Sequence, residues 1–205
     1  MTDSDQIKHR YNRVASYYDW LEKLMEKGKF SKWRRELVKQ AYGKTLEIGV
    51  GTGKNISHYP KDIELFAIDF SPNMLSKAKS RKGSGPIDIH FLEMDVQNMD
   101  FNDNTFDTVV TSCVFCSVPD PIKGLQEIRR VLKPGGQLLM LEHVRSENKV
   151  LGRFMDWLNF IPLNIWGANI NRETENNIKE AGFSNIEVRP LWKDIVKLIK
   201  IKNTK

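Results

Sequence analysis

Glycines at alternate positions, directly after a short apolar run, are the most chemically telling feature of this sequence. The run carries one acid, Glu47, and its glycines are Gly49, Gly51 and Gly53. Because glycine has no Cβ and tolerates positive φ, such a loop lets the backbone approach a ligand closely. A strand that leads into a glycine loop and then a helix commonly holds a nucleotide-like ligand. A second run, residues 64–69, ends in Asp69, whose carboxylate can accept both hydroxyls of a ribose.

The glycine spacing does not match two other nucleotide-binding loops. A dinucleotide fingerprint counted from Gly49 would need its third glycine at position 54, where the chain has Lys54. A P-loop ending at Gly53 and Lys54 would need a glycine at 48 and a hydroxyl residue at 55, where Ile48 and Asn55 stand. The remaining pattern, E-x-G-x-G-x-G with an acid downstream, resembles motif I and the next acidic position of class I S-adenosylmethionine (SAM) dependent methyltransferases. The alternative is a tight turn in an unrelated α/β protein.

The resemblance implies one SAM-dependent methyltransferase domain over residues 1–205, with S-adenosylhomocysteine as the product of the cofactor. An acid and its apolar neighbour, Asp95 and Val96, stand where family members contact adenine. The family pattern predicts no metal site. The residues that it predicts to hold SAM are Tyr17, Glu47, Gly49, Gly51, Gly53, Asp69, Phe70, Met74, Asp95, Val96 and Ser112.

Alternating helical and apolar stretches must position these residues. The predicted strands lie at about 44–49, 64–69, up to 95, 106–113 and 137–144, and the predicted helices at 53–59, from 71, and at 121–132. A further helix is expected over 171–181, followed by an antiparallel hairpin at 184–191 and 194–201. Such alternation implies a doubly wound α/β sheet, which the resemblance makes seven-stranded, mostly parallel and Rossmann-like with helices on both faces. Ligands bind at the carboxyl ends of such strands, so Gly49, Asp69, Asp95 and Ser112 should meet in one cleft.

The N-terminal residues 1–43 are expected to form a helical lid over the cofactor. The run Y-N-R-V-A-S-Y-Y-D at 11–19 resembles the opening of the ubiquinone/menaquinone-biosynthesis type of methyltransferase. The hypothesis is that Tyr17 contacts SAM and that Tyr18 closes on the reacting groups. The alternative is that these aromatic side chains only pack a helix onto the sheet.

Two features concern the methyl acceptor. His143 ends a predicted strand at the cleft edge, and histidine titrates near neutral pH, so it is the candidate general base unless it only makes a structural hydrogen bond. Residues 148–170 form a variable insert with an aromatic-rich apolar stripe. This stripe is expected to form an acceptor pocket, to lie on a membrane interface, or simply to pack over the sheet.

Composition limits the class of protein. A chain of 205 residues, 40% apolar and 28% charged, is typical of one globular domain. No run approaches the roughly 20 apolar residues of a membrane span, and the polar N-terminus favours a cytoplasmic protein. The net charge of +6 allows peripheral contact with an anionic membrane surface. One C-x-x-C pair, Cys113 and Cys116, is interpreted as two buried, reduced thiols rather than a zinc site.

The acceptor is expected to be small or lipophilic. The segments V-F-C-S-V-P-D-P, L-E-H-V-R-S-E and N-I-N-R-E-T most resemble small thiol methyltransferases, so a thiol is the first prediction. A phosphatidylethanolamine N-methyltransferase or a quinol C-methyltransferase is the alternative, and a SAM-binding regulatory protein is the non-enzymatic one. No nucleic-acid partner is expected, because no Asn/Asp-Pro-Pro-aromatic motif follows residues 106–112. The sequence does not give the oligomeric state.

Overall fold

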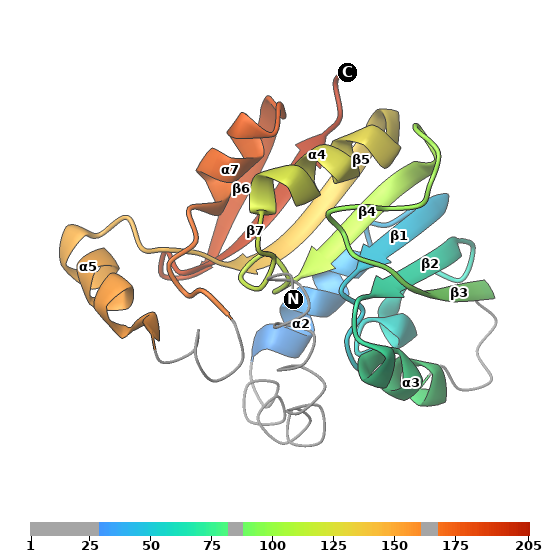
Figure 1. Cartoon of the computed structure of the whole chain (residues 1–205), viewed down its shortest axis with the longest axis horizontal. Coiled ribbons are helices and arrows are strands. Elements are labelled where there is room, and N and C mark those ends of the chain that lie inside the picture. The colour runs from blue at the N-terminus through green and yellow to red at the C-terminus, as the bar shows by residue number, and fades with distance from the viewer. Residues whose placement is uncertain (1–28, 82–87, 161–167) are drawn as a thin grey trace.

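A twisted seven-stranded sheet forms the centre of the protein, seen in a computed structural model that describes residues 29–81, 88–160 and 168–205 (Figure 1). The strands are β1 (Lys44–Ile48), β2 (Glu64–Asp69), β3 (Asp88–Glu93), β4 (Phe106–Ser112), β5 (Leu132–His143), β6 (Asn185–Trp192) and β7 (Val196–Lys202). Their order is β3-β2-β1-β4-β5-β7-β6. Strands β1 to β5 pair in parallel, and β7 runs antiparallel to both β5 and β6. The predicted doubly wound, mostly parallel α/β sheet is therefore confirmed.

Helices cover both faces of this sheet. They are α2 (Lys29–Val38), α3 (Pro72–Arg81), α4 (Pro121–Val131), α5 (Lys149–Leu158) and α7 (Thr174–Glu180), with a short 3₁₀ helix, η1, at Ile56–His58. One apolar core contains residues of α4 and α7, and a second contains residues of α2 and α3. Neighbouring strand residues alternate between the two cores, as Val109 and Val110 do in β4. Both faces are thus buried, and the polar residues Thr45, Thr108 and Thr111 of the central strands are buried with them.

Local signals set the start of two helices near the carboxyl edge of the sheet. Asp120 caps α4, since its Oδ1 accepts a hydrogen bond from Lys123 N at 3.0 Å, and Pro121 occupies the first turn. Ser71 serves α3 in the same way, with Met74 N donating to Ser71 Oγ at 3.3 Å. This cap agrees with the predicted start of a helix at residue 71, and it fixes the chain directly after β2.

Two sequence expectations about local structure are wrong. The helix expected at 53–59 is reduced to the single turn η1, because Gly53 has a φ of +80° and Pro60 follows closely. The strand expected at 137–144 begins earlier, at Leu132, so that residues 133–136 lie within β5. There the pairing of β4 with β5 shifts between Phe106 and Thr108, and Gly135 has a φ of +73°. The extra residues form an irregularity of the strand, of the kind that glycine tolerates.

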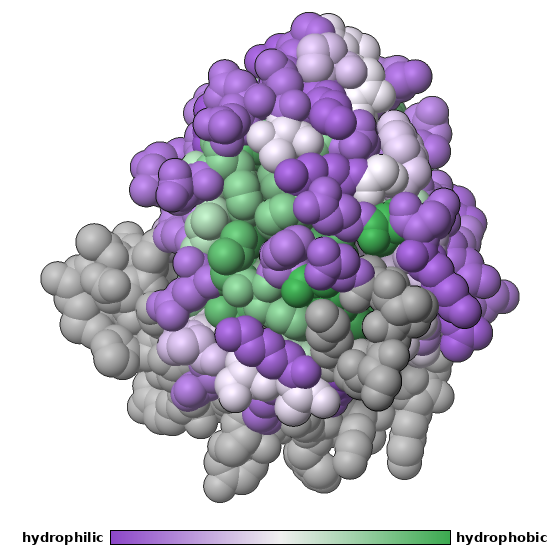
Figure 2. Space-filling model, turned by 90° about the vertical axis from the view of Figure 1, so that its right-hand side faces the viewer, coloured by the Kyte–Doolittle hydropathy of each residue, from purple (hydrophilic) through white to green (hydrophobic). Residues whose placement is uncertain are grey.

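The edge of the sheet at β3 is polar in character. Figure 2 shows this side of the molecule, where polar side chains form the rim and surround a smaller apolar area. None of the large apolar side chains that are mostly exposed within the described ranges belongs to β2, β3 or α3. Within those same ranges, no helix is long and apolar enough to span a bilayer.

Candidate active site

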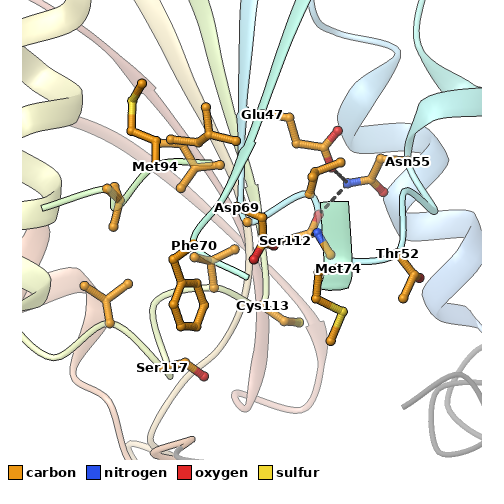
Figure 3. A pocket seen from close by; sticks show the side chains of 18 of the residues that line it. Glu47, Thr52, Asn55, Asp69, Phe70, Met74, Met94, Ser112, Cys113 and Ser117 are labelled. Carbon is orange, nitrogen blue, oxygen red and sulfur yellow. Dashed lines mark hydrogen bonds between the residues drawn. The ribbon is translucent and has the colours of Figure 1, made fainter. Parts of the chain in front are cut away.

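A cavity opens at the carboxyl ends of β1, β2 and β4. The strand order reverses between β1 and β4, and the crevice at such a reversal is where open α/β sheets bind ligands. Most residues predicted to hold the cofactor line it (Figure 3), namely Glu47, Gly49, Gly51, Asp69, Phe70, Met74, Asp95, Val96 and Ser112. Residues that end or follow four separate strands, β1 to β4, therefore line one cavity, as the sequence predicts.

The glycines of the loop have two different roles. Gly49 and Gly53 allow close packing, and Gly51 leaves the backbone accessible to a ligand. A Cβ on Gly49 would lie 2.6 Å from Val114 Cγ2, and one on Gly53 would lie 3.0 Å from Ala78 Cα. Both glycines are therefore needed for close packing, and Gly53 does not line the cavity. Gly51 differs, because its φ is +55° and the nearest atom to an added Cβ would be Gly49 O at 3.9 Å. Gly51 also lines the cavity, so it is the position where the backbone can contact a ligand closely.

Asp69 holds this loop in place from the neighbouring strand. Its Oδ2 accepts a hydrogen bond from Gly51 N at 2.9 Å, and its Oδ1 accepts one from Ser71 N at 2.9 Å. Burial raises the pKa of Asp69 to about 6, and these backbone hydrogen bonds oppose the rise. Each carboxylate oxygen can accept a second hydrogen bond. The side chain can therefore anchor the loop and still accept from a ligand hydroxyl.

Glu47 forms a buried network with Asn55 and Ser112. Asn55 Nδ2 donates to Glu47 Oε1 at 2.8 Å and to Ser112 Oγ at 3.2 Å (Figure 3). Glu47 Oε2 is buried and has no hydrogen bond of good geometry within the described part of the chain. The nearby Tyr59 hydroxyl favours its charge, yet burial dominates and raises the pKa of Glu47 to about 7. A buried carboxyl oxygen on the cavity wall can accept a hydrogen bond from a ligand amine.

Asp95 and four apolar side chains form the side of the cavity next to the carboxyl end of β3. The Asp95 carboxylate is oriented by Gln97, whose N and Nε2 donate to its Oδ1 at 2.9 and 3.2 Å. Gln97 Oε1 in turn accepts from Asp120 N, the cap of α4. The apolar lining of the cavity here comes from Phe70, Met74, Met94 and Val96. An acid beside apolar walls suits a flat heteroaromatic ring with an exocyclic amine.

Sequence reasoning missed several residues of the cavity wall. Arg34, on α2, lines the cavity, and its charge opposes the rise in the pKa of Glu47 and of Glu142. The loop after β4 adds Cys113, Val114, Ser117, Val118 and Pro119. Cys113 has a φ of +56°, so the chain turns sharply as it leaves β4. The two cysteines form no disulfide, and burial raises the pKa of Cys116 to about 11.

The structure gives less support to the predicted catalytic residues than to the predicted cofactor-binding residues. His143 ends β5 but is not among the residues that line the cavity. Burial lowers the pKa of His143 against the effect of a hydrogen bond to the Ile170 backbone, so its imidazole is neutral at pH 7 and able to accept a proton. Tyr17 and Tyr18 lie outside the described residues. The catalytic assignments of His143 and Tyr18 therefore stay predictions.

Known proteins share both the sequence pattern and the fold. The family model of the methyltransferase domain matches residues 46–140, from β1 into β5. A demethylmenaquinone methyltransferase of Symbiobacterium thermophilum is 30% identical over 172 residues, which are 78% of this chain and 68% of the relative. A phosphatidylethanolamine N-methyltransferase of Cereibacter sphaeroides is 32% identical over 166 residues, or 75% of this chain and 79% of the relative.

A solved structure agrees with the sequence relatives. A SAM-dependent methyltransferase from Thermotoga maritima superposes with a TM-score of 0.75 at 21% identity, covering 95% of this chain and 99% of the other. The chain belongs to the class I SAM-dependent methyltransferases. It is a methyltransferase enzyme whose methyl donor is SAM.

Proposed function

We propose that this enzyme transfers the methyl group of SAM to a lipophilic acceptor, a demethylated quinol, and does so at a membrane surface. The observation that carries the proposal is the similarity to a demethylmenaquinone methyltransferase over 78% of the chain. The loop that follows β4 supports it, because Val114, Val118 and Pro119 give the cavity an apolar rim. An apolar rim suits an acceptor whose body is hydrocarbon.

The cavity residues fit SAM as the donor, which supplies a methyl group already activated on a positively charged sulfur. We assign the main chain at Gly51 to a close contact with the cofactor. The remaining lone pairs of the Asp69 carboxylate are assigned to the ribose hydroxyls. We assign Glu47 Oε2 to the amine end of the cofactor, because its burial without a hydrogen bond of good geometry in the described part of the chain fits a ligand that donates one. We assign Asp95, which lines the cavity together with Met94 and Val96, to the exocyclic amine of adenine.

The protein's main task is then to position the acceptor and to remove one proton. Holding two reactants in line is worth roughly 7 to 11 kcal/mol of the barrier. A quinol becomes a good carbon nucleophile once a phenolic O–H proton has left. The new C–C bond forms as the C–S bond breaks, and the bonding pair stays on sulfur. The ring carbon then loses its proton while the phenolic oxygen regains one, so that a single proton leaves overall. His143 is the proposed acceptor of the phenolic proton, because burial keeps its imidazole neutral, and Tyr18 is proposed to close over the reacting groups.

A second candidate is N-methylation of phosphatidylethanolamine. The relative of that name is 32% identical, and this chain covers 79% of it. Both candidates share a lipid acceptor and differ in the nucleophile. The thiol predicted from the segments at 114–121, 141–147 and 169–174 is a third candidate acceptor. Unlike the other two, it is a small, water-soluble molecule.

Transfer of labelled methyl from SAM separates these acceptors. Demethylated menaquinol in micelles, phosphatidylethanolamine vesicles and a small alkyl thiol would be tested in parallel with the full chain. We expect label in the quinol. Label in the phospholipid alone would move the assignment to N-methylation, and label in the thiol alone would contradict a lipophilic acceptor. Gly51→Val, which blocks the cofactor loop, should remove all three signals.

A further inference from the structure

Large apolar side chains are exposed together at one corner of the molecule. Val150 is 80% exposed, Trp157 is 68% and Phe160 is 56%. Phe154 and Trp192 are each 52% exposed. Outside this corner, only Tyr42 and Val188 are comparably exposed among the described residues. Side chains of this size rarely stand together in water without a binding role.

Helix α5 supplies most of this surface and is apolar on two faces. Its start is fixed by Asn148, whose Oδ1 accepts hydrogen bonds from Val150 N and Leu151 N at 3.0 and 3.1 Å. The inner face is held against the protein by Met155 and by Gly152, where a Cβ would lie 2.8 Å from Ser146 O. The outer face is nevertheless apolar as well, at Val150, Phe154 and Trp157. Packing over the sheet therefore accounts for one face of α5 but not for the other.

Positive charge surrounds these exposed apolar side chains. Lys149 and Arg153 are exposed on α5, and Lys193 is exposed in the turn between β6 and β7. The Nζ atom of Lys193 lies 6.0 Å from the centre of the Trp192 ring. Lys193 also lines a shallow hollow together with Val150 and Phe154. The turn and the helix thus form one continuous surface.

Three acids lie close to this corner, and two of them form ion pairs within the protein. Asp156 pairs with Arg145, with Nη2 and Oδ2 2.8 Å apart. Glu147 pairs with Lys197 at 2.6 Å. Those two charges are offset within the protein. Asp194, which also lines the hollow, accepts hydrogen bonds from Ser146 Oγ and Glu147 N at 2.6 and 2.7 Å. The three exposed cations outnumber this one acid and give the corner a net positive character.

This corner lies on the same edge of the sheet as the active-site cavity. Helix α5 follows the carboxyl end of β5, and Trp192 ends β6, which points in the same direction. Figure 1 shows α5 at that edge, on the side of the sheet away from β3. Hydrogen bonds join it to the cavity rim, from Asn159 Nδ2 to Asn169 Oδ1 at 3.0 Å and from Asn169 N to Cys116 O at 2.7 Å. The next residue, Ser117, lines the cavity.

We propose that the α5 surface docks the enzyme on an anionic lipid bilayer. The α5 surface is defined as Val150, Phe154, Trp157, Phe160 and Trp192 with Lys149, Arg153 and Lys193. Its rings enter the headgroup region while its cations meet lipid phosphates, the arrangement of an interfacial amphipathic helix. A second copy of the chain is a poorer occupant, because a two-fold contact would bring like charges together.

Docking through the α5 surface would place the cavity rim at the lipid headgroups. Delivery of acceptor by this route rests on the proposed function. The docking itself does not, since it needs neither SAM nor acceptor.

Sedimentation with vesicles tests the docking directly. The full chain would be mixed with phosphatidylcholine vesicles that contain phosphatidylglycerol and no quinone. We expect Phe154→Ser with Trp157→Ser to weaken binding at least tenfold. The matched control is Tyr42→Ser, since Tyr42 is 49% exposed but stands before β1, at the amino edge of the sheet. Tyr42→Ser should bind as the parent does.

The charge contribution has its own matched pair. Removing Lys149 and Arg153 together, each as Gln, should weaken binding roughly fivefold per cation, and added salt should weaken the parent similarly. Lys61→Gln, on the opposite edge before β2, should have no effect.

Either of two results would overturn the proposal. One is a Phe154→Ser, Trp157→Ser protein that binds vesicles like the parent. The other is a parent that ignores the vesicles but forms a dimer which these substitutions dissociate, because the α5 surface would then be a contact between copies. If the parent binds vesicles and yet does not methylate the quinol, the assigned acceptor fails and the docking surface stands.

Discussion

The N–H of Gly51 donates a hydrogen bond to Asp69 Oδ2 at 2.9 Å, so the acid that ends β2 holds the glycine loop that follows β1. The two residues are 18 positions apart but become neighbours because β1 and β2 pair in parallel and in register. Val50 N adds a bond to Ile68 O at 3.0 Å, which ties the same two strand ends together. Asp69 therefore shapes the cavity as well as facing it.

Asp69→Ala should reduce both cofactor affinity and stability. Loss of charge-assisted bonds worth roughly 1.5 to 3 kcal/mol each predicts a SAM Kd at least tenfold higher by calorimetry. Leaving Gly51 N and Ser71 N without an acceptor should lower the free energy of unfolding by about 1 to 3 kcal/mol. The control is Asp62→Ala, an exposed acid in the connection before β2. An unchanged SAM Kd in Asp69→Ala would contradict the ribose assignment.

Gly51→Ala isolates the cofactor role of the loop. A side chain at a φ of +55° costs roughly 1 to 2 kcal/mol, and its methyl group would point into the cavity. Gly135→Ala is the matched control, because its φ is +73° and no atom lies within 4 Å of the added Cβ. Both proteins should lose similar stability in urea titrations. Only Gly51→Ala should lose SAM affinity, and equal affinities would argue against a close backbone approach at this glycine.

The raised pKa of Glu47 predicts a pH-dependent stability. The native carboxyl keeps its proton up to about pH 7, whereas the ordinary value is 4.5. Between these values the unfolded chain binds fewer protons, so the free energy of unfolding should fall as pH rises. Glu47→Gln should flatten this slope in urea titrations across the window. Glu142 has the same raised pKa of about 7 and contributes equally to the slope in both proteins. Identical slopes would therefore show that Glu47 is not the source of the pH dependence.

His143→Ala tests the proposed base. If His143 accepts the acceptor's proton, kcat should fall by roughly 10² to 10⁴-fold while the SAM Kd stays constant. The acid limb of the pH–rate profile should also disappear, because protonation of the imidazole removes the base in the parent. His58→Ala, on η1, serves as the control. Near-normal turnover in His143→Ala would leave this side chain a structural role only.

Much of the fold follows from the sequence because burial of both sheet faces imposes a simple pattern. Strand β2 has the bounds that the sequence predicts, since residues 65–68 are apolar and Asp69 follows them before the cap Ser71. Gly49, Asp69 and Ser112 could be assigned to one cleft, because parallel strands bring their carboxyl ends to one edge.

Other features depend on contacts that no local pattern reveals. Arg34 reaches the cavity only because α2 packs across the sheet, and on the sequence it resembles any basic residue of a solvated helix face. Asn55 meets Glu47 across the glycine loop, in place of the helix that was expected there. His143 lies at the correct edge, but the side to which a strand-end side chain turns depends on its pairing with Val196 of β7.

The position of the transferred methyl group distinguishes a quinol acceptor from a thiol or an amine. Isotope-labelled SAM would be turned over by the full chain with demethylated menaquinol in micelles, and the product examined by NMR. We predict a methyl resonance on a ring carbon of the quinol, with no label on oxygen. An unlabelled quinol, when the same enzyme methylates an alkyl thiol or an amine, would contradict the proposed acceptor and leave only the class of methyltransferase in place.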